Sequence, residues 1–328
     1  MSQAMQHLAR ARQKHNRFKM KCIVPDANGA VCGKRCMESH AIQHNGILSK
    51  LAENGMVYHL CETTNGDELF EYDLKAWGIS SKATIFRCLC AEHDKKLFVD
   101  IEDRIFQKEP IQCYQYALKA LLHSYWTKLN DADITKEYPD ELPVVKQIIE
   151  DQAAYTRELE CFWKILHTER YEELLTWSMC IDYEVACAVS TSINVCRRFD
   201  GELFGKENED YPLLHISVFP AEGKSWILIS CLKAYRDYYQ KFTDQFILMS
   251  SGRILQLLNI LLPLLAENIA ISPSVINMMT NQAKREFLLI FRVETMSLFY
   301  QRGINLSDWA DRVSYYIFGA SIDKGNVP

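Results

Sequence analysis

Four soft metal ligands stand in two short clusters in the first third of the chain. Cys22 and Cys32 form the first cluster, and Cys90 and His93 form the second, in the run Cys-Ala-Glu-His. Three thiolates and one imidazole are a complete ligand set for a tetrahedral zinc ion, and closed sites of this kind stabilise a fold. The sequence therefore predicts a structural Zn²⁺ site made by Cys22, Cys32, Cys90 and His93.

Two further cysteines compete for this site. Cys36 follows Cys32 at a spacing that also allows the pair to bind one ion, and Cys88 lies beside Cys90. Spacing alone leaves the choice among these thiols open. The alternative interpretation is a coincidental group of thiols around an apolar hairpin, with no metal.

A histidine between the two ligand clusters has the chemistry of a general base. His40 follows Ser39 at an expected boundary between a loop and a helix. A neutral imidazole can take a proton from the water that attacks a phosphodiester, while a hard ion such as Mg²⁺ or Mn²⁺ stabilises the developing charge. Asp94 offers a carboxylate oxygen to such an ion. The alternative is a structural His40 that caps the following helix.

These residues resemble the HNH superfamily of nucleases, and more closely a group of bacterial proteins with HNH-like or treble-clef zinc fingers. The resemblance covers the first third of the chain and implies a metal-dependent endonuclease in which His40 and Asp94 are catalytic and the zinc is structural. Bacterial proteins of this kind often serve in phage defence. The matching residues are Cys22, Cys32, Ser39, His40, Ile42, Phe86, Cys90, His93, Asp94, Leu97, Phe98, Ile101 and Glu102.

The match to the usual HNH pattern is incomplete. No Asp or Glu directly precedes His40, no proline stands two residues after it, and His93 takes the place of the last zinc cysteine. Two functions therefore stay open. One is a nuclease, and the other is a non-catalytic zinc module that works as a protein-interaction module or adaptor.

The charge distribution favours a nucleic acid as partner. The net charge of the 328 residues is only −5, but basic side chains crowd the first 36 residues, where Asp26 is the sole acidic residue. A basic arm neutralises phosphates and supplies sequence-independent affinity for DNA or RNA. A solvated N-terminal helix is the alternative.

Cysteine content and hydropathy indicate the cellular compartment of the protein. Twelve cysteines in 328 residues are too dilute for a small disulfide scaffold, and no charged-then-apolar leader precedes them. We therefore expect a cytoplasmic protein with free thiols. The longest apolar run, residues 254–266, is shorter than the ~20 residues of a membrane helix, which predicts a buried helix and no membrane partner.

Hydrophobic spacing predicts the elements that position the site. Residues 47–51 have helical spacing, and residues 56–61 and 68–74 predict two strands joined around Asn65-Gly66. These elements and the ligand clusters form an expected first domain, residues 1–108, which contains the basic arm and the HNH-like zinc module.

The rest of the chain predicts a second domain, residues 109–328. Helical spacing prevails, for example over residues 112–122 and 148–162, while residues 184–196 and 213–231 are typical of strands. The fold class is therefore α+β: an N-terminal zinc-bound finger with a β-hairpin, followed by a mainly helical domain with a small antiparallel sheet.

Overall fold

The computed structural model describes residues 20–63, 71–136, 142–204, 212–290 and 293–319. Its main sheet is antiparallel and contains β2 (Met56–Thr63), β3 (Glu71–Gly78), β5 (Leu174–Ile181), β6 (Cys187–Ile193), β7 (Leu214–Ala221), β8 (Lys224–Leu232) and β9 (Ile269–Ile271). The strand order across this sheet is β3-β2-β9-β6-β7-β8-β5. A separate small sheet pairs β1 (Ser39–His40) with β4 (Ile85–Phe86).

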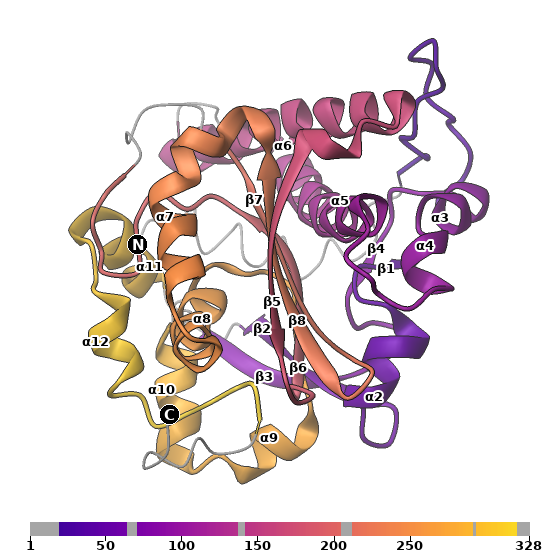
Figure 1. The fold of residues 1–328 in the computed structure, drawn as a ribbon. Coiled ribbons are helices and arrows are strands. Elements are labelled where there is room, and N and C mark those ends of the chain that lie inside the picture. Colours follow the sequence, from indigo (N-terminus) through magenta and orange to yellow (C-terminus); the bar gives the residue numbers. More distant parts are fainter. Residues whose placement is uncertain (1–19, 64–70, 137–141, 205–211, 291–292, 320–328) are drawn as a thin grey trace.

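Helices cover both faces of the main sheet (Figure 1). The zinc-ligand region and the two longest helices lie on one face, and the C-terminal helices lie on the other. The first group is η1 (His44–Leu48), α2 (Ser49–Leu51), α3 (Ala91–Leu97), α4 (Val99–Glu102), α5 (Pro110–Thr135), α6 (Pro143–Thr168) and η2 (Tyr171–Glu173). The second group is η3 (Lys233–Tyr235), α7 (Arg236–Leu248), α8 (Ser251–Leu265), α9 (Pro273–Met278), α10 (Asn281–Ile290), α11 (Val293–Arg302) and α12 (Leu306–Ala310).

The two faces of the central strands differ in chemistry, because successive side chains of a strand point to opposite faces. Val189 and Ile216 belong to the apolar core formed with α7 and α8. Ser190, Ser192 and His215 alternate with them and are buried as well. Part of the face toward α5 and α6 is therefore a buried polar layer, in which each side chain needs a hydrogen-bond partner.

Three side chains of this polar layer form a chain of hydrogen bonds. Ser192 Oγ lies 2.7 Å from His215 Nδ1, and His215 Nε2 lies 3.1 Å from Glu158 Oε1. Serine, histidine and a carboxylate also form the relay of many hydrolases. Here all three are at most 3% exposed, so a substrate cannot reach them. The network instead fixes α6 against β6 and β7.

We predict that Glu158→Ala destabilises the protein by about 2–4 kcal/mol, because it leaves Nε2 of the buried His215 ring without its carboxylate partner. Urea unfolding measures this free energy. Glu160→Ala is the control, since Glu160 is exposed on the same helix. Equal stability of the two variants would contradict the structural role of the network.

Two buried histidines make the stability depend on pH. Burial lowers the pKa of His59, on β2, to about 3, and the pKa of His123, on α5, to about 4. In the unfolded chain both titrate near ~6.5, so the unfolded state binds more protons at acidic pH. Stability contributed by neutral burial is complete above pH ~6.5 and is lost as the pH falls toward these lower values.

The expected loss between pH 7 and pH 5 is about 2 kcal/mol for each of the two histidines. Urea unfolding at the two pH values measures it. His59→Gln and His123→Gln should each make the stability less sensitive to acid, because glutamine does not titrate. A variant that keeps the full pH dependence of the parent protein would contradict burial of that histidine in its neutral form.

The structure confirms the α+β class and shows a larger sheet than the sequence predicts. Residues 56–61 lie in β2 and residues 71–74 lie in β3, which pairs with it, whereas the predicted turn and residues 68–70 fall outside the described residues. β5 and β9 enlarge the sheet, and Tyr58 of β2 lies opposite Ile271 of β9. The hairpin of the expected first domain thus belongs to the same sheet as strands of the expected second domain.

The apolar run at residues 254–266 largely coincides with α8, whose side chains are mostly buried. Across the described ranges, no helix has both the length and the apolar character needed to cross a membrane. The N-terminal basic arm lies for the most part outside the described residues.

Candidate metal centre

A narrow hairpin-like loop brings the first two ligands together. The backbone N–H of Cys22 donates to the carbonyl of Lys34 at 2.8 Å, and the N–H of Gly33 donates to the carbonyl of Cys22 at 3.0 Å. The N–H of Cys32 donates to Val24 O at 2.9 Å. Gly33 has a φ of +65°, a left-handed conformation that suits glycine. The chain reverses between the two cysteines, where the N–H of Asp26 donates to Ala30 O at 2.9 Å, and the left-handed Gly33 lies in the returning segment beside Cys22.

The start of α3 supplies the other two ligands. Cys90 occupies the extended position before the helix, and His93 lies in its first turn. Two backbone hydrogen bonds join this segment to the first ligand loop, from Ile23 N to Cys88 O at 3.1 Å and from Met37 N to Leu89 O at 2.8 Å. The two clusters are consequently parts of one local structure, although about 60 residues separate them in the sequence.

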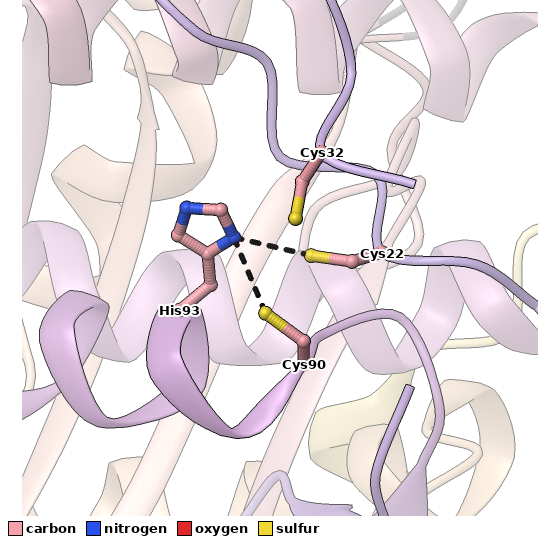
Figure 2. A group of neighbouring side chains, drawn as sticks. All are labelled: Cys22, Cys32, Cys90 and His93. Atoms are coloured by element: carbon pink, nitrogen blue, oxygen red, sulfur yellow. Dashed lines mark hydrogen bonds between the residues drawn. The ribbon is translucent and has the colours of Figure 1, made fainter. Parts of the chain in front are cut away.

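The four predicted ligands converge on one point (Figure 2). His93 Nδ1 lies 3.2 Å from Cys22 Sγ and 3.5 Å from Cys90 Sγ, and all four ligand atoms, including Cys32 Sγ, lie within 4.8 Å of one another. Zn–S bonds of about 2.3 Å and Zn–N bonds of about 2.0 Å place tetrahedral ligand atoms ~3.5–3.8 Å apart. The donor set and the spacing therefore fit a zinc ion.

The geometry also separates the ligands from the competing thiols. Cys88 is fully buried, and its Sγ lies 3.8 Å from the carbonyl of Leu122 on α5, within the hydrophobic core. Cys36 is outside the group of four, although burial, together with Cys90 and Cys32 nearby, raises its pKa to about 11. Burial likewise raises the pKa of Cys22 to about 12, so a metal ion must displace its proton on binding.

The metal centre rests on the long helix α5. Cys22 and Cys90 are 1% and 4% exposed, and they belong to the same hydrophobic cluster as Phe86, Phe98 and Leu118. An ion held here would therefore fix the first ligand loop, β4 and α3 against the helix that covers the sheet.

β1, β4 and α3 form a ββα unit that contains His40. His40 lies opposite Ile85 in the small sheet, and Cys90 follows β4 directly before α3. His40 Nδ1 donates a hydrogen bond to Ala83 O at 3.1 Å, which leaves Nε2 as the basic nitrogen. The next residue, Thr84, has a φ of +59°, a strained conformation for a β-branched side chain. Such strain is concentrated at functional sites.

The surroundings of His40 favour its neutral form. Burial is the main cause that lowers the pKa of His40, and the nearby positive charges of His44 and Lys119 lower it further. Glu102 acts in the opposite direction. Lys119 is 4% exposed and forms an ion pair with Glu102, whose backbone carbonyl accepts a hydrogen bond from Gln43 Nε2 at 3.0 Å.

Asp94 is not among the charged groups that change the pKa of His40. It directly follows His93 on α3 and is half-buried, and within the described residues it does not belong to a cluster of metal-ligand side chains. Glu102 is the acidic side chain that acts on His40. The role of Asp94 as a ligand for a hard ion stays a prediction. His44 and Lys119 were missed in the sequence analysis. The spacing of four residues between His40 and His44 is a signal that could have found His44.

The fold and the site together define an α+β protein with a Cys₃His cluster that can hold a metal ion such as zinc. Comparisons of the chain with models of protein families, with curated proteins and with solved structures find no match. Function must therefore be argued from the site itself.

Proposed function

We propose that this protein binds nucleic acid and cleaves phosphodiester bonds, with His40 as the general base and with zinc at the Cys₃His site as a structural ion. The observation that carries the proposal is the fixed, neutral imidazole of His40 on the ββα unit. Its Nδ1–H is held by Ala83 O at 3.1 Å, and burial lowers its pKa. A base needs this combination of a fixed ring and a free, unprotonated nitrogen.

The zinc ion has a positioning role in this proposal. The four ligands lie on the loop that precedes β1 and on the helix that follows β4, and so on both sides of the small sheet. Zinc at a closed four-ligand site joins such segments covalently and leaves no open coordination position. The ion would hold β1 and β4 in register, and with them His40.

Exposed basic side chains near the metal centre support a polyanionic partner. Lys21 and Arg35 pair through their backbones at the base of the first ligand loop, and Lys95 and Lys96 lie on α3. These four are exposed and form no ion pair within the described part of the chain. Basic groups of this kind gain affinity by displacing counterions from phosphates.

The test of this proposal is cleavage by zinc-loaded full-length protein. Supercoiled plasmid and single-stranded RNA are incubated with and without Mg²⁺ or Mn²⁺, because the HNH resemblance implies a hard ion beside His40. The proposal expects strand cleavage of at least one substrate. Binding that weakens with salt, but without cleavage under any condition, would contradict the catalytic part and retain the binding part.

A non-catalytic adaptor is the second candidate function. Its support is the extent of the contact between the zinc-ligand region and α5, which is typical of a zinc ion that only stabilises a fold. In that case the helices would bind a protein partner. Absence of both cleavage and nucleic-acid binding, with zinc present, would favour this function.

A further inference from the structure

Two histidines face one another beside the ββα unit. The ring centroids of His40 and His44 are 5.2 Å apart, and the ring planes meet at 48°. In each ring Nδ1 lies beside an oxygen atom, since His40 Nδ1 is 3.1 Å from Ala83 O and His44 Nδ1 is 2.8 Å from Asn45 Oδ1. These contacts orient both rings and leave Nε2 of His40 for proton transfer, while Nε2 of His44 faces a serine hydroxyl.

The environments of the two rings suit opposite roles. Burial keeps His40 neutral by lowering its pKa, so its Nε2 can accept a proton. His44 Nε2 lies 3.2 Å from Ser80 Oγ. Each nitrogen of the His44 ring thus lies beside a side-chain oxygen. Two histidine rings held this close together can divide the roles of general base and general acid.

Fixed charges lie close to the pair. Lys119 is buried and is held by its ion pair with Glu102, 4.8 Å from the centre of the Phe98 ring. Gln43, the residue before His44, donates to the backbone carbonyl of Glu102. Both His40 and His44 are only half-buried, so a phosphodiester can approach them, and the positive charge of Lys119 acts on His40.

We infer that the substrate of this site is RNA, and that His40 and His44 cleave it by transferring the phosphoryl group to the adjacent 2′-oxygen. The inference rests on the proposed function and names its substrate class. A general base and a general acid are all that an internal nucleophile requires, because the 2′-hydroxyl is already bonded next to the phosphorus and needs no binding of water.

The atoms of this reaction balance without a further reactant. His40 Nε2 removes the proton of the 2′-hydroxyl, and the 2′-oxygen forms a bond to phosphorus. The bond from phosphorus to the 5′-oxygen breaks, and His44 gives its proton to that oxygen. The products are a 2′,3′-cyclic phosphate and a 5′-hydroxyl. His40 is then protonated and His44 neutral, and exchange with water restores both rings.

The substrate arm of the test compares two oligonucleotides that differ by one atom. Both are single-stranded RNA, and one carries a 2′-deoxy sugar at a defined linkage. Zinc-loaded protein is expected to cut that linkage only when the 2′-hydroxyl is present, and to leave a 2′,3′-cyclic phosphate. His40→Ala and His44→Ala should each lower the rate by about 10²–10⁴-fold, whereas His167→Ala, at an exposed histidine near the end of α6, should not.

A modified leaving group tests the separate role of His44. Sulfur in place of the 5′-bridging oxygen leaves without needing a proton. It should restore most of the rate of His44→Ala and little of the rate of His40→Ala, a pattern that a merely structural role of His44 would not produce.

The outcomes separate the inference from the proposed function. Equal cleavage of the deoxy linkage, or products with a 5′-phosphate, would overturn the RNA inference and leave the proposed phosphodiesterase intact. No cleavage of either oligonucleotide or of plasmid DNA would overturn both.

Discussion

Cys90→Ser is expected to empty the metal centre and to unfold the segments around it. Cys90 supplies one of three sulfur ligands and adjoins His93 in the cluster. Structural zinc contributes about 10–16 kcal/mol in small zinc modules, so the loss of one thiolate removes a large part of the energy that holds the first ligand loop to α3. Zinc content by mass spectrometry should fall from one ion per chain to nearly none, and proteolysis should become rapid near residues 20–40.

The matched control is Cys161→Ser, because Cys161 is an exposed cysteine on α6 that is absent from the metal-ligand cluster. It should keep zinc and resist proteolysis as the parent protein does. A Cys90→Ser protein with a full complement of zinc and unchanged proteolysis would contradict the ligand assignment. Cys36→Ser provides a further comparison, since our assignment predicts that it retains zinc.

His40→Ala is expected to abolish cleavage while the zinc content and the fold remain unchanged. Loss of a general base costs about 10²–10⁴ in rate, and the side chain of His40 is not a zinc ligand. The parent protein should also keep its rate as the pH falls to 6.5, the ordinary value of histidine, because burial lowers the pKa of His40. Single-turnover rates measured across this pH range test both statements.

Three observations would contradict this role of His40. They are cleavage by His40→Ala at the parental rate, an equal loss of rate in the control His167→Ala, and loss of zinc from His40→Ala. The last would show that the residue supports the metal centre and would leave its catalytic role without evidence.

The Cys₃His cluster could be predicted from the sequence because its signal is local. Cys90 and His93 lie on one helical turn, and Asn28-Gly29 marks the turn between Cys22 and Cys32. The sequence alone could not exclude Cys88 as a ligand. It depends on the packing of Cys88 against Leu122 of α5, a contact between residues far apart in the sequence.

Only part of the sheet could be predicted, because some of its strands have a local sequence pattern and others depend on distant partners. β6, β7 and β8 show apolar or β-branched patterns, whereas β9 has only three residues and lies between helices. Its strand conformation comes from pairing with both β2 and β6, two strands about 130 residues apart in the chain. Local propensity carries no information about such a partner.

The surroundings of His40 were the least predictable part. Sequence spacing singled out His40 but paired it with Asp94, because Asp94 follows a zinc ligand and carries an oxygen donor. In the structure η1 brings His44 to the ring of His40, and α5 brings Lys119 near it. The buried hydrogen-bond chain of Ser192, His215 and Glu158 was equally hidden, since its members come from three different elements.

X-ray absorption spectroscopy at the zinc edge of the purified full-length protein is the most direct test of the Cys₃His metal centre, to which our proposal assigns the positioning of His40. We predict one zinc ion per chain with three sulfur neighbours at about 2.3 Å and one nitrogen neighbour at about 2.0–2.1 Å. A protein without zinc, or a zinc shell made only of oxygen and nitrogen, would contradict the site and with it the structural basis of the proposed function.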